Sequence, residues 1–232
     1  MKYILSLILG CIALPSYADA VCYETYLSKA ALAPLSYIAR YEGLSAEVTR
    51  EVNRLEKGQW KLDQQLKMML VGITETSVVR NTNKGVETLA YSFNQSGLGA
   101  REYTINVDPN TYLAQVYRKG QASTYQGVSD MVDTQSHILQ LQLQLSCSAS
   151  PANQYSFNLV KRGGVREYTY NFVSNQTLKL DDGQELEAQL WERTKDDTVD
   201  RLWLASKQDY RLVRFQHREG DKVSELRIRS TI

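Results

Sequence analysis

Histidine is scarce in this sequence, and the residue patterns of common catalytic and metal sites are absent from it. The only histidines are His137 and His217. A serine hydrolase needs a serine in a G-x-S-x-G turn together with a histidine and an acid, and the sequence contains no such turn. Metal sites need several His, Cys, Asp or Glu residues at ligand spacing, and neither histidine has such neighbours along the chain. We therefore predict a protein that is not an enzyme, with no catalytic residue, metal site or cofactor.

Long apolar runs are also missing, apart from one at the N-terminus. Lys2 precedes an apolar stretch from Tyr3 to Leu14, which leads to the small-x-small site Ser16-Tyr17-Ala18. A charged start, an apolar stretch and such a site are typical of a cleaved secretory signal. We predict that residues 1–18 are removed, with cleavage after Ala20 as the alternative.

Two kinds of membrane anchor are the alternatives to cleavage. About twelve apolar residues are too few for a membrane-spanning helix, which needs about 20. Cys11 lies inside the apolar stretch with bulky Leu9 near it, whereas the lipidated cysteine of a lipoprotein ends its signal and follows small residues. We therefore expect no transmembrane anchor after cleavage and a mature protein in the periplasm of a Gram-negative bacterium.

Neither sign of charge is in excess. Lys and Arg number 27 against 26 Asp and Glu, and loss of Lys2 with the signal leaves 26 of each. Binding to nucleic acid needs a basic face that displaces counterions from phosphates, so we predict no nucleic-acid partner. We divide the chain into a signal (1–18), an N-terminal lead-in (19–35) and a single antiparallel β domain (36–232), which is long enough for one sizeable core.

Cysteine is rare, and the mature chain keeps only Cys22 and Cys147. An even pair in an oxidising compartment predicts one disulfide. The bond would close a long loop and would stabilise the fold by roughly 4 to 5 kcal/mol in the chain-entropy model. Two unpaired thiols are the alternative, because the sequence does not show whether the Cα atoms approach each other.

Alternation of apolar and polar residues is the dominant pattern from Ser36 onward, and it predicts strands. Trp60, Leu62, Leu66, Met68 and Leu70 share one parity and predict a long strand with one wet face. The same alternation occurs in five further segments, 89–93, 103–107, 155–159, 168–172 and 186–190.

Turn residues separate these strands, and no β-α-β rhythm is present. Asp181-Asp182-Gly183 and Glu219-Gly220-Asp221 predict hairpins. We predict a mainly β (α+β) fold, a coiled antiparallel sheet or open half-barrel with one or two short helices, and we disfavour a parallel α/β architecture.

Two segments depart from the strand pattern. Residues 23–34 carry apolar side chains at helical spacing, which predicts a short helix or an irregular lead-in. The second segment covers residues 133–146, in which Leu139, Leu141, Leu143 and Leu145 alternate with glutamines, which is the period of a strand. Leu and Gln are good helix formers, however, and Asp133 is a suitable N-cap, so we favour a helix there.

Tyrosine is abundant, with fifteen residues against four phenylalanines. Its apolar ring and polar tip suit a sheet face that lines a cavity, although ordinary strand filling is the alternative.

The carboxylate pairs Asp181-Asp182 and Asp196-Asp197 adjoin predicted turns. Aspartate favours turns for backbone reasons, so we interpret both pairs as solvated turn residues.

The C-terminal third contains a recognisable order of motifs. It runs through Asp181-Asp182-Gly183, Trp203-Leu204-Ala205, Asp209-Tyr210, Leu212-Val213-Arg214 and Glu219-Gly220-Asp221. This order resembles the bacterial family catalogued as domain of unknown function 3108 (DUF3108), which has a T-x-x-G hairpin, a W-L-[SA]-x-D-x-x-[YL]-x-P-V-R strand and a D-G turn before the last strand. Two earlier landmarks also fit, Tyr41-x-Gly43-Leu44 and Asp130-Met131-Val132-Asp133.

The resemblance covers most of residues 36–231, and only the stretch from Trp203 to Arg214 is specific. Leu212 departs from the pattern, because the family commonly has proline there. The resemblance implies an exported domain of coiled antiparallel sheet, similar to the open barrels of periplasmic lipoprotein carriers that shelter an acyl chain. It implies no established activity.

Three functional hypotheses follow, of which the first is a periplasmic binding or carrier domain for a lipid or another apolar or amphipathic envelope molecule. The second is an interaction module that docks another cell-envelope protein. The third, an envelope hydrolase that uses the turn carboxylates, we rank last. We expect Trp203, with Leu202 and Leu204 on the opposite face of its strand, to be a structural anchor covered on one side by the helix that follows Asp133.

Overall fold

The computed structural model describes residues 17–68 and 70–229, which form two helices and one sheet of fourteen strands. The helices are α1 (Tyr17–Ala30) and α2 (Ser136–Cys147). The strands are β1 (Leu35–Tyr41), β2 (Leu44–Arg54), β3 (Gln59–Lys67), β4 (Val71–Thr82), β5 (Gly85–Gly97), β6 (Arg101–Val107), β7 (Leu113–Arg118), β8 (Gln121–Gln126), β9 (Gln154–Lys161), β10 (Gly164–Lys179), β11 (Glu185–Lys195), β12 (Thr198–Ala205), β13 (Arg211–Glu219) and β14 (Lys222–Ile228).

The sheet is an antiparallel meander in two halves. Strands β1 to β8 form one half and β9 to β14 the other, and β1 pairs with β14 to join them. Strands β8 and β9 are therefore the two edges, and the ladder of described strands does not close into a barrel. The predicted fold class, a coiled antiparallel sheet or open half-barrel with one or two short helices, is confirmed.

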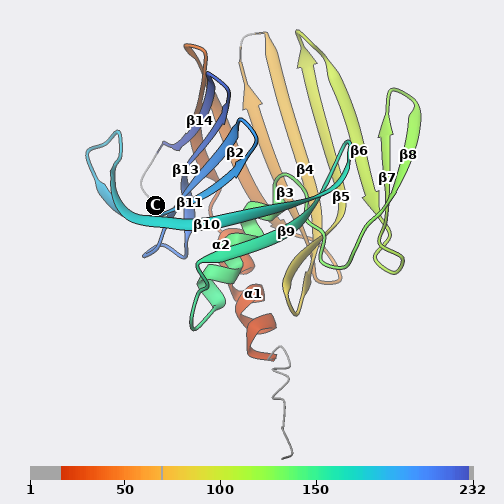
Figure 1. Ribbon diagram of the computed structural model, residues 1–232, viewed down its shortest axis with the longest axis horizontal. Helices are drawn as coiled ribbons and strands as arrows, with labels where there is room; N and C mark the ends of the chain where they lie inside the picture. Colours follow the sequence, from red (N-terminus) through yellow and green to blue (C-terminus); the bar gives the residue numbers. More distant parts are fainter. Residues whose placement is uncertain (1–16, 69, 230–232) are drawn as a thin grey trace, which may run out of the picture.

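The sheet coils into a cup around α2 (Figure 1). The turns that follow β1, β3, β5 and β13 lie at one end of the cup, and both helices close the other end. This arrangement follows from the antiparallel order, because successive strands of a meander run in opposite directions and every second turn lies at the same end of the sheet. The end without helices is called the rim below.

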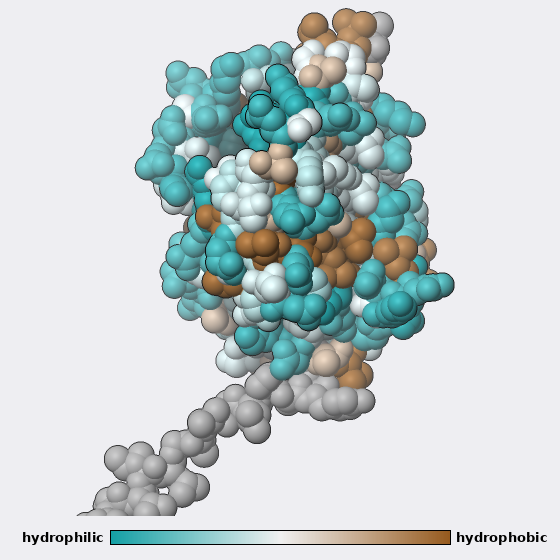
Figure 2. Space-filling model, turned by 90° about the vertical axis from the view of Figure 1, so that its right-hand side faces the viewer, coloured by the Kyte–Doolittle hydropathy of each residue, from teal (hydrophilic) through white to brown (hydrophobic). Residues whose placement is uncertain are grey.

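Side chains bridge the seam between the two edges of the sheet. One apolar cluster there contains Val116 of β7, Val160 of β9 and Met131 of the segment before α2. Gly164 at the start of β10 lies against the ring of Tyr125 in β8. Figure 2 views the molecule from the side of β7 and β8 and shows apolar residues in a band across its middle, with hydrophilic residues above and below.

Helix α2 explains the alternation of leucine and glutamine. Residues two apart on a helix point about 200° apart, whereas residues four apart share a face. Leu139 and Leu143 therefore pack on one side, with Trp60 of β3, and Leu141 and Leu145 pack on the opposite side, against β9 to β13. A period of two suits a helix that is buried between two sheet halves. The helix prediction is confirmed over the alternative of a strand.

The glutamines of α2 hold the turns on both sides. Gln140 accepts a hydrogen bond from the Val86 N–H and donates one to the Lys84 carbonyl oxygen, both at 2.6 Å. Gln142 donates to the carbonyl oxygen of Tyr210 at 2.9 Å. The amides thus satisfy backbone groups that would otherwise be buried without partners.

Asp133 provides the cap of α2, although the helix starts three residues later. Its Oδ1 accepts hydrogen bonds from the backbone N–H groups of Gln135 and Ser136 at 2.8 and 3.0 Å. The same carboxylate accepts hydroxyl hydrogen bonds from Ser77 and Thr88, both at 2.7 Å. The cap therefore also fastens the helix to β4 and β5.

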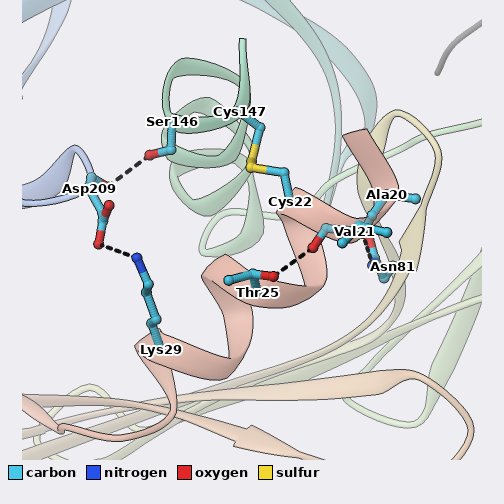
Figure 3. Close-up of a disulfide and its surroundings, with 9 residues drawn as sticks. All are labelled: Ala20, Val21, Cys22, Thr25, Lys29, Asn81, Ser146, Cys147 and Asp209. Atoms are coloured by element: carbon cyan, nitrogen blue, oxygen red, sulfur yellow. Dashed lines mark hydrogen bonds and ion pairs between the residues drawn. A yellow bond between two sulfur atoms is a disulfide. The ribbon is translucent and has the colours of Figure 1, made fainter. Parts of the chain in front are cut away.

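The predicted disulfide between Cys22 and Cys147 is present, with the Cα atoms 5.7 Å apart. It joins α1 to the last residue of α2 (Figure 3). Of the two alternatives for residues 23–34, a short helix or an irregular lead-in, the structure has the helix, as part of α1, which ends at Ala30. Its Leu27 is fully buried beside Trp60. The lead-in therefore contributes to the core.

The long strand predicted from Trp60 to Leu70 is wrong at its C-terminal end. Strand β3 ends at Lys67, and Leu70 is 74% exposed next to the following turn. The predicted hairpins are confirmed, because Gly183 and Gly220 lie in the β10–β11 and β13–β14 turns with positive φ angles. The predicted signal lies outside the described residues except for positions 17 and 18. No helix in the described ranges has the length and apolar character needed to cross a membrane.

Candidate ligand cavity

A cavity of about 900 Å³ occupies the cup on the rim side of α2. Its floor is the N-terminal end of α2, where Thr134, Gln135, His137 and Ile138 lie. Its walls come from strands in both halves of the sheet. A second cavity, between α1 and β1, measures only about 70 Å³, which is room for a few water molecules.

One part of the cavity wall is apolar and aromatic. This part combines aliphatic side chains with the rings of three tyrosines and one phenylalanine. Its members are Ala39, Tyr41, Val48, Leu66, Ile138, Leu159, Tyr168, Tyr170, Leu212, Phe215 and Leu226. Some of the abundant tyrosines thus line the cavity, since Tyr168 and Tyr170 share the inner face of β10.

The rest of the wall is charged, with more basic than acidic side chains. The basic residues are Arg40, Arg50, Arg101, Lys161, Arg166, Arg193 and Lys195. The acidic residues are Glu75, Asp196, Asp200, Glu219 and Glu225. An amphipathic lining of this kind suits a ligand that has both an apolar part and a polar or charged part.

His137 lies at the floor of the cavity and is buried. Its Nδ1 is 3.1 Å from the Asp133 carbonyl oxygen, and its Nε2 is 3.2 Å from the Tyr170 hydroxyl. A carbonyl oxygen only accepts hydrogen bonds, so Nδ1 carries the hydrogen and Nε2 accepts one from Tyr170. Burial lowers the pKa of His137 to about 4, which keeps the imidazole neutral at pH 7.

Asp200 is the centre of a charged group on the wall. Its carboxylate contacts Arg193 at 2.7 Å and His217 Nδ1 at 2.6 Å. The three residues lie opposite one another on β11, β12 and β13, and the Arg193 guanidinium lies 3.6 Å from the centre of the Tyr168 ring. Sequence reasoning missed this group, because strand register and not sequence spacing brings its members together.

A second carboxyl, that of the half-buried Glu75, also lines the cavity. Burial is the main reason that the pKa of Glu75 is raised, and the nearby Asp133 raises it further. The Oε1 atom of Gln135 is buried without a hydrogen-bond partner in the described part of the chain. Buried polar atoms of this kind are commonly satisfied by water or by a ligand.

The five motif residues predicted from the sequence do not line the cavity: Trp203, Leu204, Asp209, Tyr210 and Arg214. Leu204 is fully buried in the cluster that packs on α2. Trp203 points to the opposite face, where it packs with Leu190 and donates a hydrogen bond to Gln176 at 2.8 Å. The Arg214 guanidinium lies 4.5 Å from the centre of the Trp203 ring and pairs with Glu225 at 2.7 Å.

Asp209 and Tyr210 form the turn between β12 and β13, with φ angles of 50° and 52°. The Asp209 carbonyl oxygen accepts from Ser146 at 3.1 Å, and its carboxylate lies 3.5 Å from Lys29 (Figure 3). Together with the Gln142 bond to Tyr210, these contacts dock the turn on both helices. The motif therefore positions the helices that close the cup.

The two aspartate pairs that sequence reasoning weighed for catalysis lie apart from each other. Asp181 and Asp182 lie in the turn before β11, and Asp196 and Asp197 lie in the turn after it. Asp196 reaches the cavity edge, whereas Asp181 lies 3.7 Å from Arg227. No group of three potential metal-ligating side chains occurs within residues 17–68 and 70–229.

Comparison with known proteins identifies the fold. No family model matches the chain, and neither does any curated protein. Among solved structures, the chain is similar to the crystal structure of a β-barrel-like protein of domain of unknown function DUF1849 from Brucella abortus. The TM-score is 0.53 at 8% sequence identity, and the match covers 84% of this chain and 94% of the other. The likeness shows a shared β-barrel-like fold.

Proposed function

We propose that this chain is an exported periplasmic binding or carrier protein, without enzymatic activity, for a lipid or another amphipathic envelope molecule. The observation that carries the proposal is the cavity of about 900 Å³ whose lining combines apolar and charged side chains. Its volume is typical of small-molecule sites, which measure about 300 to 1,000 Å³. The Cys22–Cys147 bond supports export, since disulfides persist in oxidising compartments. Membership of DUF3108 belongs to the same proposal.

Native mass spectrometry of the protein purified from its host tests this function. We expect a bound mass in addition to the polypeptide. A Ser224→Trp variant should lose it, because Ser224 lines the cavity on the inner face of β14 and an indole there occupies ligand volume.

The matched control is Ser123→Trp on the exposed edge strand β8, which should keep the bound mass. Both variants should melt close to the wild-type temperature. A wild-type spectrum without ligand, together with no binding of added amphiphiles, would contradict the carrier function.

A module that docks another envelope protein is the second candidate. Leu70 and Leu98 favour it, because they lie in neighbouring turns at the rim and are 74% and 75% exposed. A pull-down that returns one stoichiometric protein and no lipid would favour this function over the carrier.

A further inference from the structure

A smaller hollow of about 340 Å³ lies beside the large cavity, between strands β5 and β6 and the turn of the β9–β10 hairpin. Its lining consists of Phe93, Arg101, Tyr103, Lys161, Arg162, Gly163 and Arg166. Three of these residues, Arg101, Lys161 and Arg166, also line the large cavity. The two spaces therefore adjoin each other at these three side chains.

The charge of this hollow is of one sign. Four of its seven lining residues are basic and none is acidic. Within the described ranges, none of the four has a carboxylate at ion-pair distance, in contrast to Arg193, which pairs with Asp200. Cations that converge without carboxylates repel one another, and a bound anion relieves that repulsion.

Strand alternation explains why no carboxylate intervenes. Arg101 and Tyr103 share one face of β6, so Glu102 between them points to the other face. Arg166 and Tyr168 likewise share a face of β10, and Glu167 points away. Glu75 is an acidic group on the inner wall that acts on Tyr103 of this hollow, and burial raises the pKa of its carboxyl.

Two of the cations are held in place by aromatic rings. The Arg101 guanidinium lies 5.2 Å from the centre of the Phe93 ring, and its Nε donates to Gln95 at 3.0 Å. Lys161 donates to the Tyr168 hydroxyl at 2.6 Å. Arg101 keeps its two terminal nitrogens available, and this forked group matches phosphate oxygens.

We propose that Arg101, Lys161, Arg162 and Arg166 bind a phosphate group, which is the head of an amphiphile whose chain enters the large cavity. The position of the chain rests on the proposed carrier function, whereas the phosphate site stands on the cationic hollow alone. Three arginines and one lysine supply enough donors for all the oxygens of a phosphate monoester.

Isothermal titration of the mature protein tests the proposal with three probes. Myristoyl lysophosphatidic acid has the phosphate and the chain, myristoyl lysophosphatidylcholine carries the chain with a zwitterionic head, and glycerol 3-phosphate has the phosphate alone. We expect lysophosphatidic acid to bind best, with an affinity that falls as salt increases.

The test variant is Arg162→Gln/Arg166→Gln. Both side chains are exposed, so the fold should be retained. We expect the affinity for lysophosphatidic acid to fall by about tenfold or more, because charge-assisted hydrogen bonds are lost, while binding of lysophosphatidylcholine stays unchanged. The matched control Lys179→Gln/Arg218→Gln removes two exposed cations that line neither space and should behave as wild type. If the test variant unfolds, Arg162→Lys/Arg166→Lys keeps the charge and should retain the salt dependence.

The outcomes separate the phosphate site from the carrier function. Equal binding of both lysolipids, unaffected by the Arg162 and Arg166 substitutions, would overturn the phosphate site and leave the carrier intact. Binding of glycerol 3-phosphate that the test variant loses, without binding of either lysolipid, would support the phosphate site and contradict the carrier. Absence of binding by all three probes would overturn the phosphate site.

Discussion

At the scale of single residues, Trp203 lies in a strand that packs on both faces. Its ring is 5% exposed, packs with the β10–β11 hairpin and lies beneath the Arg214 guanidinium. Its neighbours Leu202 and Leu204 point to the other face and pack against α2, which is the cover expected from the sequence. Because the strand is apolar on both faces, the side chain at 203 matters for packing and not for the cavity.

Trp203→Ala should destabilise the protein by about 3 to 5 kcal/mol, because it leaves a cavity and removes the partner of Gln176. That cost is a large part of a typical domain stability of about 5 to 15 kcal/mol. Urea unfolding measures it. The control is Tyr117→Ala, which truncates an exposed aromatic side chain and should lower the free energy of unfolding only slightly. A variant that melts like wild type but loses a bound ligand would show that Trp203 contacts the ligand.

His137 should make stability depend on pH. Its pKa of about 4 in the folded state is below the ordinary value of 6.5, so the unfolded chain binds the proton more readily. The free energy of unfolding should have its full value above about pH 6.5 and decrease as the pH falls from there to about 4. The protonation of His137 should lower it by about 3 kcal/mol in all. Urea unfolding between pH 4 and 7 measures the slope. The His137→Gln variant should lack this part of it, and an imidazole NMR titration with a midpoint near 6.5 would contradict the assignment.

At the scale of elements, α2 depends on its surroundings on every side. The disulfide attaches α1 to its C-terminus, and the Asp133 carboxylate holds its N-terminus to β4 and β5. Leucines on opposite faces bury against both sheet halves. The helix therefore serves as the core around which the sheet coils.

The Cys22→Ser/Cys147→Ser variant should lose about 2 to 5 kcal/mol of stability, because the bond closes a loop of 125 residues and docks α1. Thermal unfolding of the variant and of the reduced wild-type protein measures the loss, and the two should agree. Oxidised wild-type protein is the control. Equal melting of all three forms would mean that α1 docks through Leu27 and Tyr23 without help from the bond.

At the scale of the whole molecule, the cup places a cavity, a cationic hollow and a closed end around one helix. The proposed carrier function requires export, because the envelope molecules that it would bind lie outside the cytoplasm. When the full-length chain is expressed in a Gram-negative host, we expect it in the periplasmic extract, with the mass of a chain whose first residue is Asp19. A start at Val21 would indicate cleavage after Ala20. Retention of the unprocessed chain in the membrane fraction would contradict export, and a lipidated Cys11 would indicate an anchor.

The sequence by itself determined the fold class and most strands and hairpins, favoured the disulfide and α2 over their alternatives, and left α1 as one of two possibilities. Each of these rests on a local signal: alternation for strands, glycine in turns, leucine and glutamine propensity for α2, and an even cysteine count. The strand predicted to reach Leu70 failed because local alternation does not show where a turn begins. Met68 and Leu70 continue the parity of Trp60 but lie beyond the end of β3.

Only the tertiary structure decided the site. His217 and Asp200 meet because β12 and β13 pair in one register, and His137 and Tyr170 meet because α2 lies inside the sheet. Arg101 and Arg162 line one hollow because the β9–β10 hairpin crosses to β6. None of these distances is encoded in sequence spacing. Local patterns set which face each side chain occupies, whereas the coiling of the whole sheet sets which faces enclose a cavity.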